Sequence, residues 1–385
     1  MDAEMNAYRC SIVRGGTSKG IFIMANELPA DPAERDKVLL AIFGSPDIRQ
    51  IDGLGGADVL TSKLAVISPC PTDEADVDYT FGQVSTTEPF IDYGGNCGNI
   101  SSAVGGFAID MGLVKPVEPV TEVRIRMTNT SRVLRAEVPV KNGKAAVEGD
   151  LHIDGVPGTG AKIKMDWTDA VGGITGSLLP TGNACDTYTV RGKDFTVSVV
   201  DAGNIVVFVP AEQFGLTGTE TPQQIEADAE LMDTVEELRG RICQSIGLVE
   251  KWEDARRITP YQPFFAMVSK AREHECFNGA HIEAGECDLV SRLIFMLHMH
   301  KAYPITGTVA TGVAACIPGS VVAEVSGWKN AEQKVLHIAH PAGVIPVEVD
   351  SVEENGSVTI TRVAIYRTAR RIMDGTVYVK KSLLE

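Results

Sequence analysis

Short apolar runs, rich in β-branched and aromatic residues, recur along the whole chain between glycine, proline and polar positions. Runs of this length and composition are typical of β-strands, and the least interrupted ones are typical of strands buried on both faces. The pattern predicts strands at residues 20–24, 64–68, 77–84, 123–127, 196–200, 205–209, 264–268, 335–339, 345–349 and 358–362.

Helical patterns are fewer. Residues 31–43 combine an acidic first turn with apolar side chains at helical spacing. Residues 222–246 form a long amphipathic stretch with a proline near its start and a glycine directly after it. An acidic N-cap candidate opens the apolar segment 288–299. These three segments are predicted to be helices.

Two further segments, 99–111 and 311–325, consist of small residues with few charges. A helix that is apolar all round is a buried helix, and small side chains allow strands to surround it closely. We therefore expect two buried central helices. Pro318 and Gly319 interrupt the second of them and weaken that prediction.

The order of the expected elements occurs twice. A strand, a loop and an amphipathic helix span 21–44 and again 205–247. A strand ending in serine (KLAVIS, then FFAMVS), a glycine-containing segment before a small-residue helix, and a hairpin-rich tail at 123–148 and 335–361 follow in each case. This order predicts two related halves that meet near residues 165–190, with a ligand site between them.

Composition narrows the class of protein. With 385 residues, 44% hydrophobic and 22% charged, the chain is globular and long enough for about two to three domains. The net charge of −16 argues against nucleic acid and anionic membranes as partners. Neither a signal peptide nor a membrane-spanning run is recognisable. Eight cysteines without a C-x-x-C motif favour reduced thiols and a cytoplasmic protein.

The sharpest local motif is Gly94-Gly95-Asn96-Cys97-Gly98-Asn99, directly before the first small-residue helix. Glycines let the backbone approach a ligand closely, and free N–H groups at a helix start bind anions and favour a thiolate. A reactive thiol and an anionic substrate would both suit this position. The alternative is a buried structural cysteine beside a glycine turn, and the residues leave both open.

Two cationic segments come earlier in the chain. Thr61-Ser62-Lys63 stands at the start of the strand at 64–68, after the glycine-rich loop at 52–58. A lysine at a strand edge is usually solvated, but in a cleft it can act as an acid or base. Arg14–Gly20 (RGGTSKG) offers cations, hydroxyls and backbone donors that suit a carboxylate or phosphate, or it is a plain hairpin.

Other polar residues give weaker signals. His298 and His300 do not share a helix face, and the loose set His274, Cys276, His281 and Cys287 lies in a polar loop. Arg367, Arg370 and Arg371 fit surface charge or a structural clamp. The sequence carries no nucleotide-binding or metal-ligand motif, so we expect no cofactor and no metal.

Four segments in combination, GGTSKG, FGSPDIRQIDGLGGADVLTSK, DYGGNCGN and YRTARR, resemble the 2-methylaconitate isomerase family of the diaminopimelate-epimerase-like superfamily. The resemblance covers essentially the whole chain, and within the family it is strongest to the 3-methylitaconate Δ-isomerase branch. It implies an α/β (α+β) fold of two pseudo-symmetric domains, each a curled sheet or barrel around a central helix. We expect these domains at 1–180 and 181–370, with a C-terminal strand in 371–385 that returns to the first.

The resemblance also implies the site residues. The family's proton-transfer pair falls on Lys63 and Cys97. Backbone N–H groups of Gly98 and Asn99, with the Asn96 side chain, are expected to hold one substrate carboxylate. A second carboxylate is assigned to Ser18, Lys19, Arg292 and a turn at Thr311-Gly312. Thr17 and Ser62 complete the expected binding residues.

The chemistry that follows is a cofactor-free shift of a double bond, by proton transfer, in a small unsaturated di- or tricarboxylic acid of the methylitaconate or 2-methylaconitate type. A 4-oxalomesaconate-type tautomerase is the alternative enzyme. A racemase is disfavoured, because epimerases of the superfamily use two cysteines and residues 309–312 contain none. A non-catalytic carboxylate-binding protein is the alternative of another class. A homodimer is a hypothesis for which the sequence carries no signal.

Overall fold

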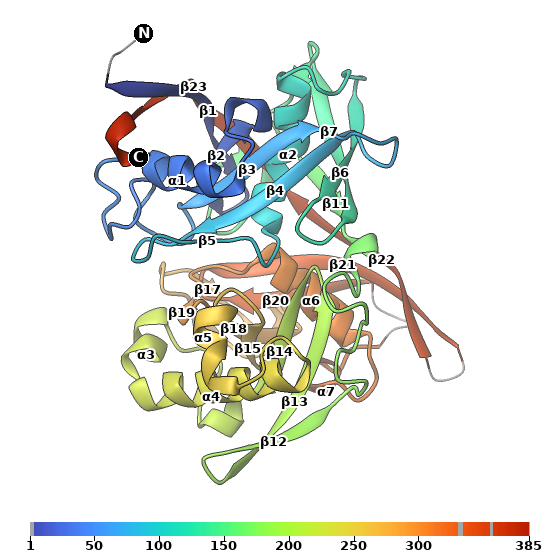
Figure 1. The fold of residues 1–385 in the computed structure, drawn as a ribbon. Coiled ribbons are helices and arrows are strands. Elements are labelled where there is room, and N and C mark those ends of the chain that lie inside the picture. The colour runs from blue at the N-terminus through green and yellow to red at the C-terminus, as the bar shows by residue number, and fades with distance from the viewer. Residues whose placement is uncertain (1–3, 330–333, 355–356, 385) are drawn as a thin grey trace. The chain divides into compact units, whose positions relative to one another are not determined.

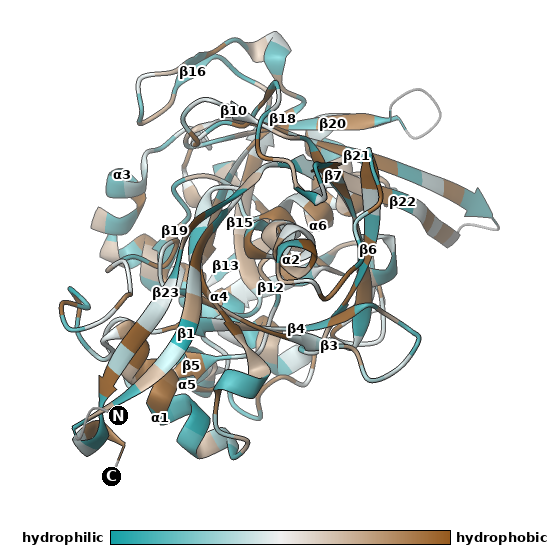
Figure 2. Ribbon diagram, turned by 90° about the horizontal axis from the view of Figure 1, so that it is seen from above, coloured by the Kyte–Doolittle hydropathy of each residue, from teal (hydrophilic) through white to brown (hydrophobic). Residues whose placement is uncertain are grey.

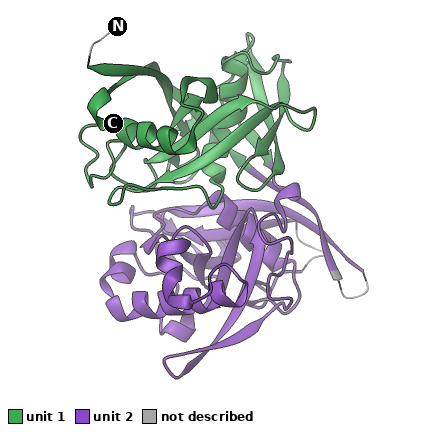
Figure 3. Cartoon of the chain, in the orientation of Figure 1, with its two compact units in different colours: residues 1–165, 366–385 green, residues 166–365 purple. Residues whose placement is uncertain are grey.

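The computed structural model describes residues 4–329, 334–354 and 357–384. By its internal packing the chain divides into two compact units (Figure 3). Unit 1 comprises residues 1–165 and 366–385, and unit 2 comprises residues 166–365. The domain limits expected from the sequence, at residues 180 and 370, stay a prediction.

Unit 1 is built mainly from strands (Figure 1). They are β1 Met5–Gly15, β2 Ser18–Met24, β3 Lys63–Pro69, β4 Val77–Val84, β5 Ile91–Asp92, β6 Val120–Met127, β7 Arg132–Lys141, β8 Lys144–Ala145, β9 Leu151–His152, β10 Thr159–Gly160, β11 Ile163–Asp166 at the unit boundary, and β23 Ala369–Lys380. The main sheet has the order β7-β6-β4-β3-β2-β1-β23, in which β2–β3 and β4–β6 are parallel. The C-terminal β23 pairs with β1 along its whole length.

Two helices cover opposite faces of this sheet. α1 (Pro32–Phe43) begins at Asp31, whose carboxylate caps the Glu34 N–H, and packs its buried side chains on β2 and β3. α2 (Gly98–Asp110) is buried along almost its whole length, and strands surround it when it is viewed end-on (Figure 2). Strands between two helices bury both faces, which explains their continuous apolar runs. The short helices η1 (Ala25–Glu27) and η6 (Lys381–Leu383) complete this unit.

Unit 2 repeats this plan. Its strands are β12 Asp186–Val190, β13 Lys193–Ala202, β14 Asn204–Pro210, β15 Phe264–Lys270, β16 His274–Glu275, β17 His281–Ile282, β18 Leu289–Phe295, β19 His298–Met299, β20 Val335–His340, β21 Gly343–Glu354 and β22 Ser357–Arg367, which crosses the unit boundary. The sheet order β12-β13-β14-β15-β18-β20-β21-β22 again has two parallel pairs, β14–β15 and β18–β20. The predicted repeat of element order is therefore present in the structure.

The helices of unit 2 are arranged as in unit 1, with one helix on the outer face of the sheet and one buried helix. They are η2 Thr168–Ala170, η3 Ala211–Phe214, α3 Pro222–Ala227, α4 Ala229–Ser245, η4 Trp252–Asp254, α5 Ala255–Ile258, η5 Ala284–Glu286, α6 Ile305–Ala315 and α7 Val321–Ser326. α4 covers one face of the sheet through Leu231, Val235 and Leu238, whereas α6 is buried throughout and contacts β13, β14 and β21. Among the described residues, no helix of either unit is long and apolar enough to cross a membrane.

Three predicted helices differ from the structure. Residues 288–299 form the strands β18 and β19, because a fully buried central strand has the same unbroken apolar pattern as a buried helix. The stretch 222–246 is broken at Asp228, whose side chain caps α4. The second small-residue helix starts earlier than 311, at Ile305, and α7 follows separately after Pro318-Gly319.

Candidate active site

Lys63 is the first residue of β3, and it is buried in unit 1. Its ammonium donates to Gln83 Oε1 on the neighbouring β4 at 2.8 Å, and it lies 5.4 Å from the centre of the Phe81 ring. Gln83 is itself held by its amide, which donates to the backbone carbonyls of Val59 and Ser62. The lysine is thus a positioned interior group, and the reading as a solvated edge residue does not hold.

Cys97 is the N-cap residue of α2 and is 7% exposed. No side chain caps this helix start, so the first N–H groups of α2 have no side-chain acceptor there. Tyr79 of β4 lies beside the thiol: burial raises the pKa of Tyr79 well above 10, and the charge of Cys97 raises it further. The thiol therefore stands at an uncapped helix N-terminus next to a protonated phenol.

The loop before Cys97 is fixed by side-chain hydrogen bonds. Asp92 accepts from the Gly94 N–H at 2.7 Å, and Asn129 donates to the carbonyl oxygens of Phe81 and Tyr93. Asn96 donates to Thr130 Oγ1 at 3.4 Å. These bonds tie the glycine-containing loop to β4 and to the turn after β6, which makes the position of Cys97 a property of the sheet.

The β1–β2 hairpin contacts the first turn of α2. The Asn99 amide donates to Thr17 Oγ1 and accepts from the Thr17 N–H, at 3.1 and 3.3 Å. A Cβ at Gly16, which has φ +49°, would lie 2.1 Å from Asn99 Oδ1, so only glycine fits this contact. The structure thus brings together Thr17 and Asn99, two of the residues predicted to bind substrate.

Gly20 of β2 connects Lys63 to the same helix turn. A Cβ at Gly20 would lie 2.8 Å from the Lys63 carbonyl oxygen and 3.0 Å from Ile100 Cδ1. The start of β3 and the first turn of α2 are therefore separated by one glycine. This packing places the Lys63 and Cys97 positions at the same end of the unit 1 sheet.

Ser62, Ser18 and Lys19 lie around this end. Ser62 donates to Gln50 Oε1 at 2.6 Å, and Gln50 also accepts from Ala57 N–H, so Ser62 holds the glycine-rich loop. Ser18 begins β2 with a buried hydroxyl that has no partner among the described residues. The Lys19 backbone N–H donates to the Leu60 carbonyl. The Ser18 hydroxyl therefore has the free bonding capacity that a ligand needs.

The predicted residues of unit 2 have different surroundings. Arg292, on β18, is 1% exposed and donates to the carbonyl oxygens of Glu220 and Ser291. Burial lowers the pKa of Arg292 to about 10. It pairs with no carboxylate among the described residues, so it still has capacity for an anion.

The turn predicted at Thr311-Gly312 is wrong, because both residues lie in the middle of α6. Their backbone N–H groups are used within the helix. The Thr311 hydroxyl donates to the Gly307 carbonyl and contacts the Tyr303 hydroxyl, and Gly312 packs closely against Val347. The prediction failed because α6 begins six residues before Thr311, at Ile305, next to Pro304.

Among the described residues, one group has the geometry of a metal site: Glu273, His281 and Glu283, all exposed. The cysteines of the loose His/Cys set do not join it. Cys276 and Cys287 pack instead in an apolar cluster with Ile282 and Val290. Exposed carboxylates beside one histidine are ordinary surface charge, and we assign them no role.

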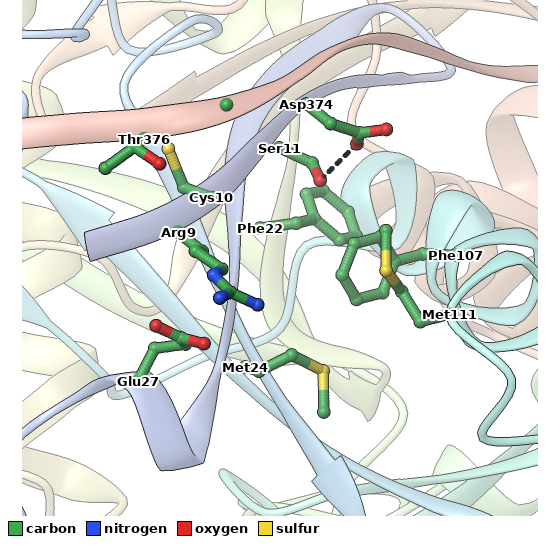
Figure 4. Close-up of a pocket in the computed structure, with 11 residues that line it drawn as sticks. Arg9, Cys10, Ser11, Phe22, Met24, Glu27, Phe107, Met111, Asp374 and Thr376 are labelled. Carbon is green, nitrogen blue, oxygen red and sulfur yellow. Dashed lines mark hydrogen bonds between the residues drawn. The ribbon is translucent and has the colours of Figure 1, made fainter. Parts of the chain in front are cut away.

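A cavity of about 470 Å³ opens elsewhere in unit 1 (Figure 4). It lies between β1, β23, β2 and the C-terminal half of α2, and none of the predicted site residues lines it. Ser11 donates to Asp374 there at 2.7 Å. Burial, with the nearby Asp374 charge, raises the pKa of Cys10. The thiol of this cavity is a poor nucleophile, and the cavity is distinct from the Lys63–Cys97 end.

Sequence reasoning missed Gln83, Tyr79 and Arg367. Tyr79, Phe81 and Gln83 are every second residue of β4, so their side chains lie on one buried face of the strand. A polar Gln83 on that face is a signal that the sequence contains. The structure buries Arg367 to 5% exposure, so of the two predicted alternatives surface charge is wrong. Nothing local in YRTARR distinguishes its buried arginine from the exposed one at position 370.

Comparison with known proteins places this geometry in a family. Residues 5–380 match the PrpF protein family. The chain is 51% identical to the 3-methylitaconate isomerase of Eubacterium barkeri, over 97% of this chain and 98% of that protein. It is 38% identical to the 4-oxalomesaconate tautomerase of Pseudomonas putida, over 96% and 95%.

Solved structures agree. The crystal structure of a methylitaconate-delta-isomerase superposes with a TM-score of 0.82 at 50% identity, covering 100% of this chain and 98% of that one. A hydroxyproline epimerase from Agrobacterium vitis shares the fold, with a TM-score of 0.59 at 12% identity over 98% and 93%. The predicted epimerase-like α/β fold is thereby confirmed. The chain belongs to the PrpF protein family, and it is an isomerase.

Proposed function

We propose that this isomerase moves a carbon–carbon double bond in a small unsaturated di- or tricarboxylic acid of the methylitaconate or methylaconitate type. The observation that carries the proposal is that unit 1 contains both a positioned interior lysine and a thiol at an uncapped helix start, linked through the packing of Gly20. The names of the relatives support the substrate class.

The reaction needs a base and an acid. One of Lys63 and Cys97 removes a proton from the allylic carbon, and the C–H electron pair becomes the new double bond of a dienolate. The other group delivers a proton to the far carbon of the original double bond. Charge that develops on the substrate carboxylate is stabilised by the N–H groups of Gly98 and Asn99 at the α2 start.

The remaining polar groups fix the substrate. In this proposal Thr17 and Asn99, held to each other, and the free Ser18 hydroxyl form one wall in unit 1. The buried cation Arg292 of unit 2 is a further carboxylate ligand. A local cationic surface is required, because the net charge of −16 repels a dianion at long range.

Proton NMR in D2O tests the proposal with a panel of 3-methylitaconate, 2-methylaconitate and 4-oxalomesaconate. We expect double-bond migration of one of the first two acids, with deuterium incorporated at the carbon that receives the proton. Preferential turnover of oxalomesaconate would favour the tautomerase instead, as the relative from Pseudomonas putida suggests. Turnover of none of the three would contradict the substrate class.

A further inference from the structure

Arg367 is a buried cation that lacks a paired carboxylate in the part of the chain that the structure describes. It is 5% exposed, and among the described residues its one hydrogen bond runs from a terminal nitrogen to the neighbouring Tyr366 carbonyl at 3.0 Å. Its Nε is buried and has no acceptor among the described residues. No described carboxylate forms an ion pair with it. Burial lowers the pKa of Arg367 to about 9, against the raising effect of the Asp154 charge, so the guanidinium remains protonated at neutral pH.

A buried arginine with a structural role, Arg239, shows which partners Arg367 lacks. Arg239 of α4 is equally buried, but it binds both carboxylate oxygens of Glu236, at 2.6 and 2.8 Å, and donates to two backbone carbonyls. Buried charge without such partners costs free energy, so proteins retain it chiefly where a ligand supplies the partner. Arg367 is the kind of residue for which an external anion completes the bonding.

The position of Arg367 relates it to the candidate active site. The Cβ position of Gly16 lies 2.1 Å from Asn99 Oδ1 and 3.2 Å from Arg367 Cδ, so both side chains meet the β1–β2 hairpin at one residue. Thr368, between β22 and β23, fixes the chain next to the arginine, because the Gly16 N–H donates to the Thr368 carbonyl and Arg14 bonds Thr368 twice. The buried, unpartnered hydroxyl of Ser18 lies in the same hairpin.

We propose that Arg367 is a substrate-binding residue: its guanidinium binds one carboxylate of the substrate against the Gly16–Ser18 hairpin of unit 1. This inference rests on the proposed function for the identity of the anion. It deepens that function by assigning one substrate carboxylate to a planar two-point donor, which favours a carboxylate over an ester or amide.

The test measures binding apart from turnover. In a Cys97→Ala background, titration calorimetry with itaconate and with each of its monomethyl esters compares Arg367→Met, Arg367→Lys and Arg370→Gln. Arg370 is the matched control, since it lies on the same segment, is exposed and faces Arg14 across the strands. We expect Arg367→Met to lose about 10- to 100-fold in affinity for the diacid. Arg367→Met should also lose the preference for the diacid over one monoester, and Arg367→Lys should retain part of that preference. Arg370→Gln should change neither the affinity for the diacid nor the preference.

Thermal unfolding separates this role from a structural clamp. Arg367→Met should leave the ligand-free Tm unchanged or raise it, because it removes an unpaired buried charge, whereas Arg239→Met should lower it. Unchanged diacid affinity and selectivity in Arg367→Met, or a Tm loss like that of Arg239→Met, would overturn the proposal. So would a parent protein that binds none of these acids. If diacid binding depends on Arg367 but no acid is isomerised, the proposed reaction fails and the anion site stands.

Discussion

The two units place different chemistry on the same scaffold. β3 and β15, which occupy the same place in the repeat, have identical burial patterns over seven residues. The first residue of β3 is Lys63, paired with Gln83, whereas the first residue of β15 is Phe264, packed edge-on against Phe295 with ring centres 5.7 Å apart. One position thus carries a buried polar pair in unit 1 and an aromatic pair in unit 2.

The central helices differ in the same way. The N-cap residue of α2 is Cys97, whereas the N-cap residue of α6 is Pro304, which has neither a thiol nor an N–H. The second helical residue contacts the hairpin in both units, and a positive-φ glycine makes room for it in each, Gly16 in unit 1 and Gly203 in unit 2. In unit 2 that residue, Thr306, accepts from Asn204 within a fully buried network. The scaffold is repeated, but the two residues proposed for proton transfer both lie in unit 1.

The largest expected effect is on catalysis. Cys97→Ala and Lys63→Ala should each lose at least about 10²-fold in kcat, the usual scale for an acid or base group. Both should keep the wild-type melting curve. The matched controls are Cys316→Ala, a buried thiol at the end of α6, and Lys37→Ala, an exposed lysine on α1. Near wild-type turnover of either site variant would remove that residue from the mechanism.

Substitution at the corresponding position in unit 2, Phe264, should lower the stability of the protein. Phe264→Ala deletes a buried ring from an aromatic cluster, so we expect a loss of about 3–5 kcal/mol in the free energy of unfolding. Denaturant titration followed by fluorescence measures it. The kcat of the folded fraction should fall far less than in Lys63→Ala. A catalytic defect as large as that of Lys63→Ala, without loss of stability, would contradict the assignment of chemistry to unit 1 alone.

A smaller effect is expected when the partner of Lys63 is removed. Gln83→Met keeps the length of the side chain but deletes the oxygen that accepts from the ammonium. A hydrogen bond to a charged group is worth about 1.5–3 kcal/mol, which corresponds to roughly 10- to 100-fold in kcat if it fixes Lys63 for proton transfer. Steady-state kinetics on the best panel substrate measure this. A change confined to KM would show that Gln83 does not position the lysine.

Much of this comparison was readable from the sequence, and its gaps have physical causes. The repeat and the two small-residue helices follow from local patterns, whereas the roles of Lys63 and Cys97, implied by the family resemblance, stay a prediction. The strand β18 was mistaken for a helix because buried strands and buried helices share one apolar pattern. Arg367 escaped because the hairpin that it packs against, at Gly16, lies more than 350 residues away in the chain, which no local pattern records.

The smallest expected effect is the protection of Cys97 by substrate. A bound carboxylate would occupy the N–H groups at the α2 start and shield the Cys97 sulfur. Iodoacetamide at pH 8 should therefore label Cys97, and a diacid at about five times its Kd should slow that labelling roughly sixfold. The half-exposed Cys70 and Cys185 serve as internal controls that no diacid protects.

Burial raises the pKa of Cys243 and Cys316 to about 11, so at pH 8 only about one such thiol in 10³ is ionised. Their labelling should rise about tenfold for each pH unit up to that pKa. Peptide mass spectrometry reads all sites at once. If Cys316 were labelled before Cys97 at pH 8, and no diacid protected Cys97, the reactive thiol would lie in unit 2. The assignment of proton transfer to unit 1 would then be wrong.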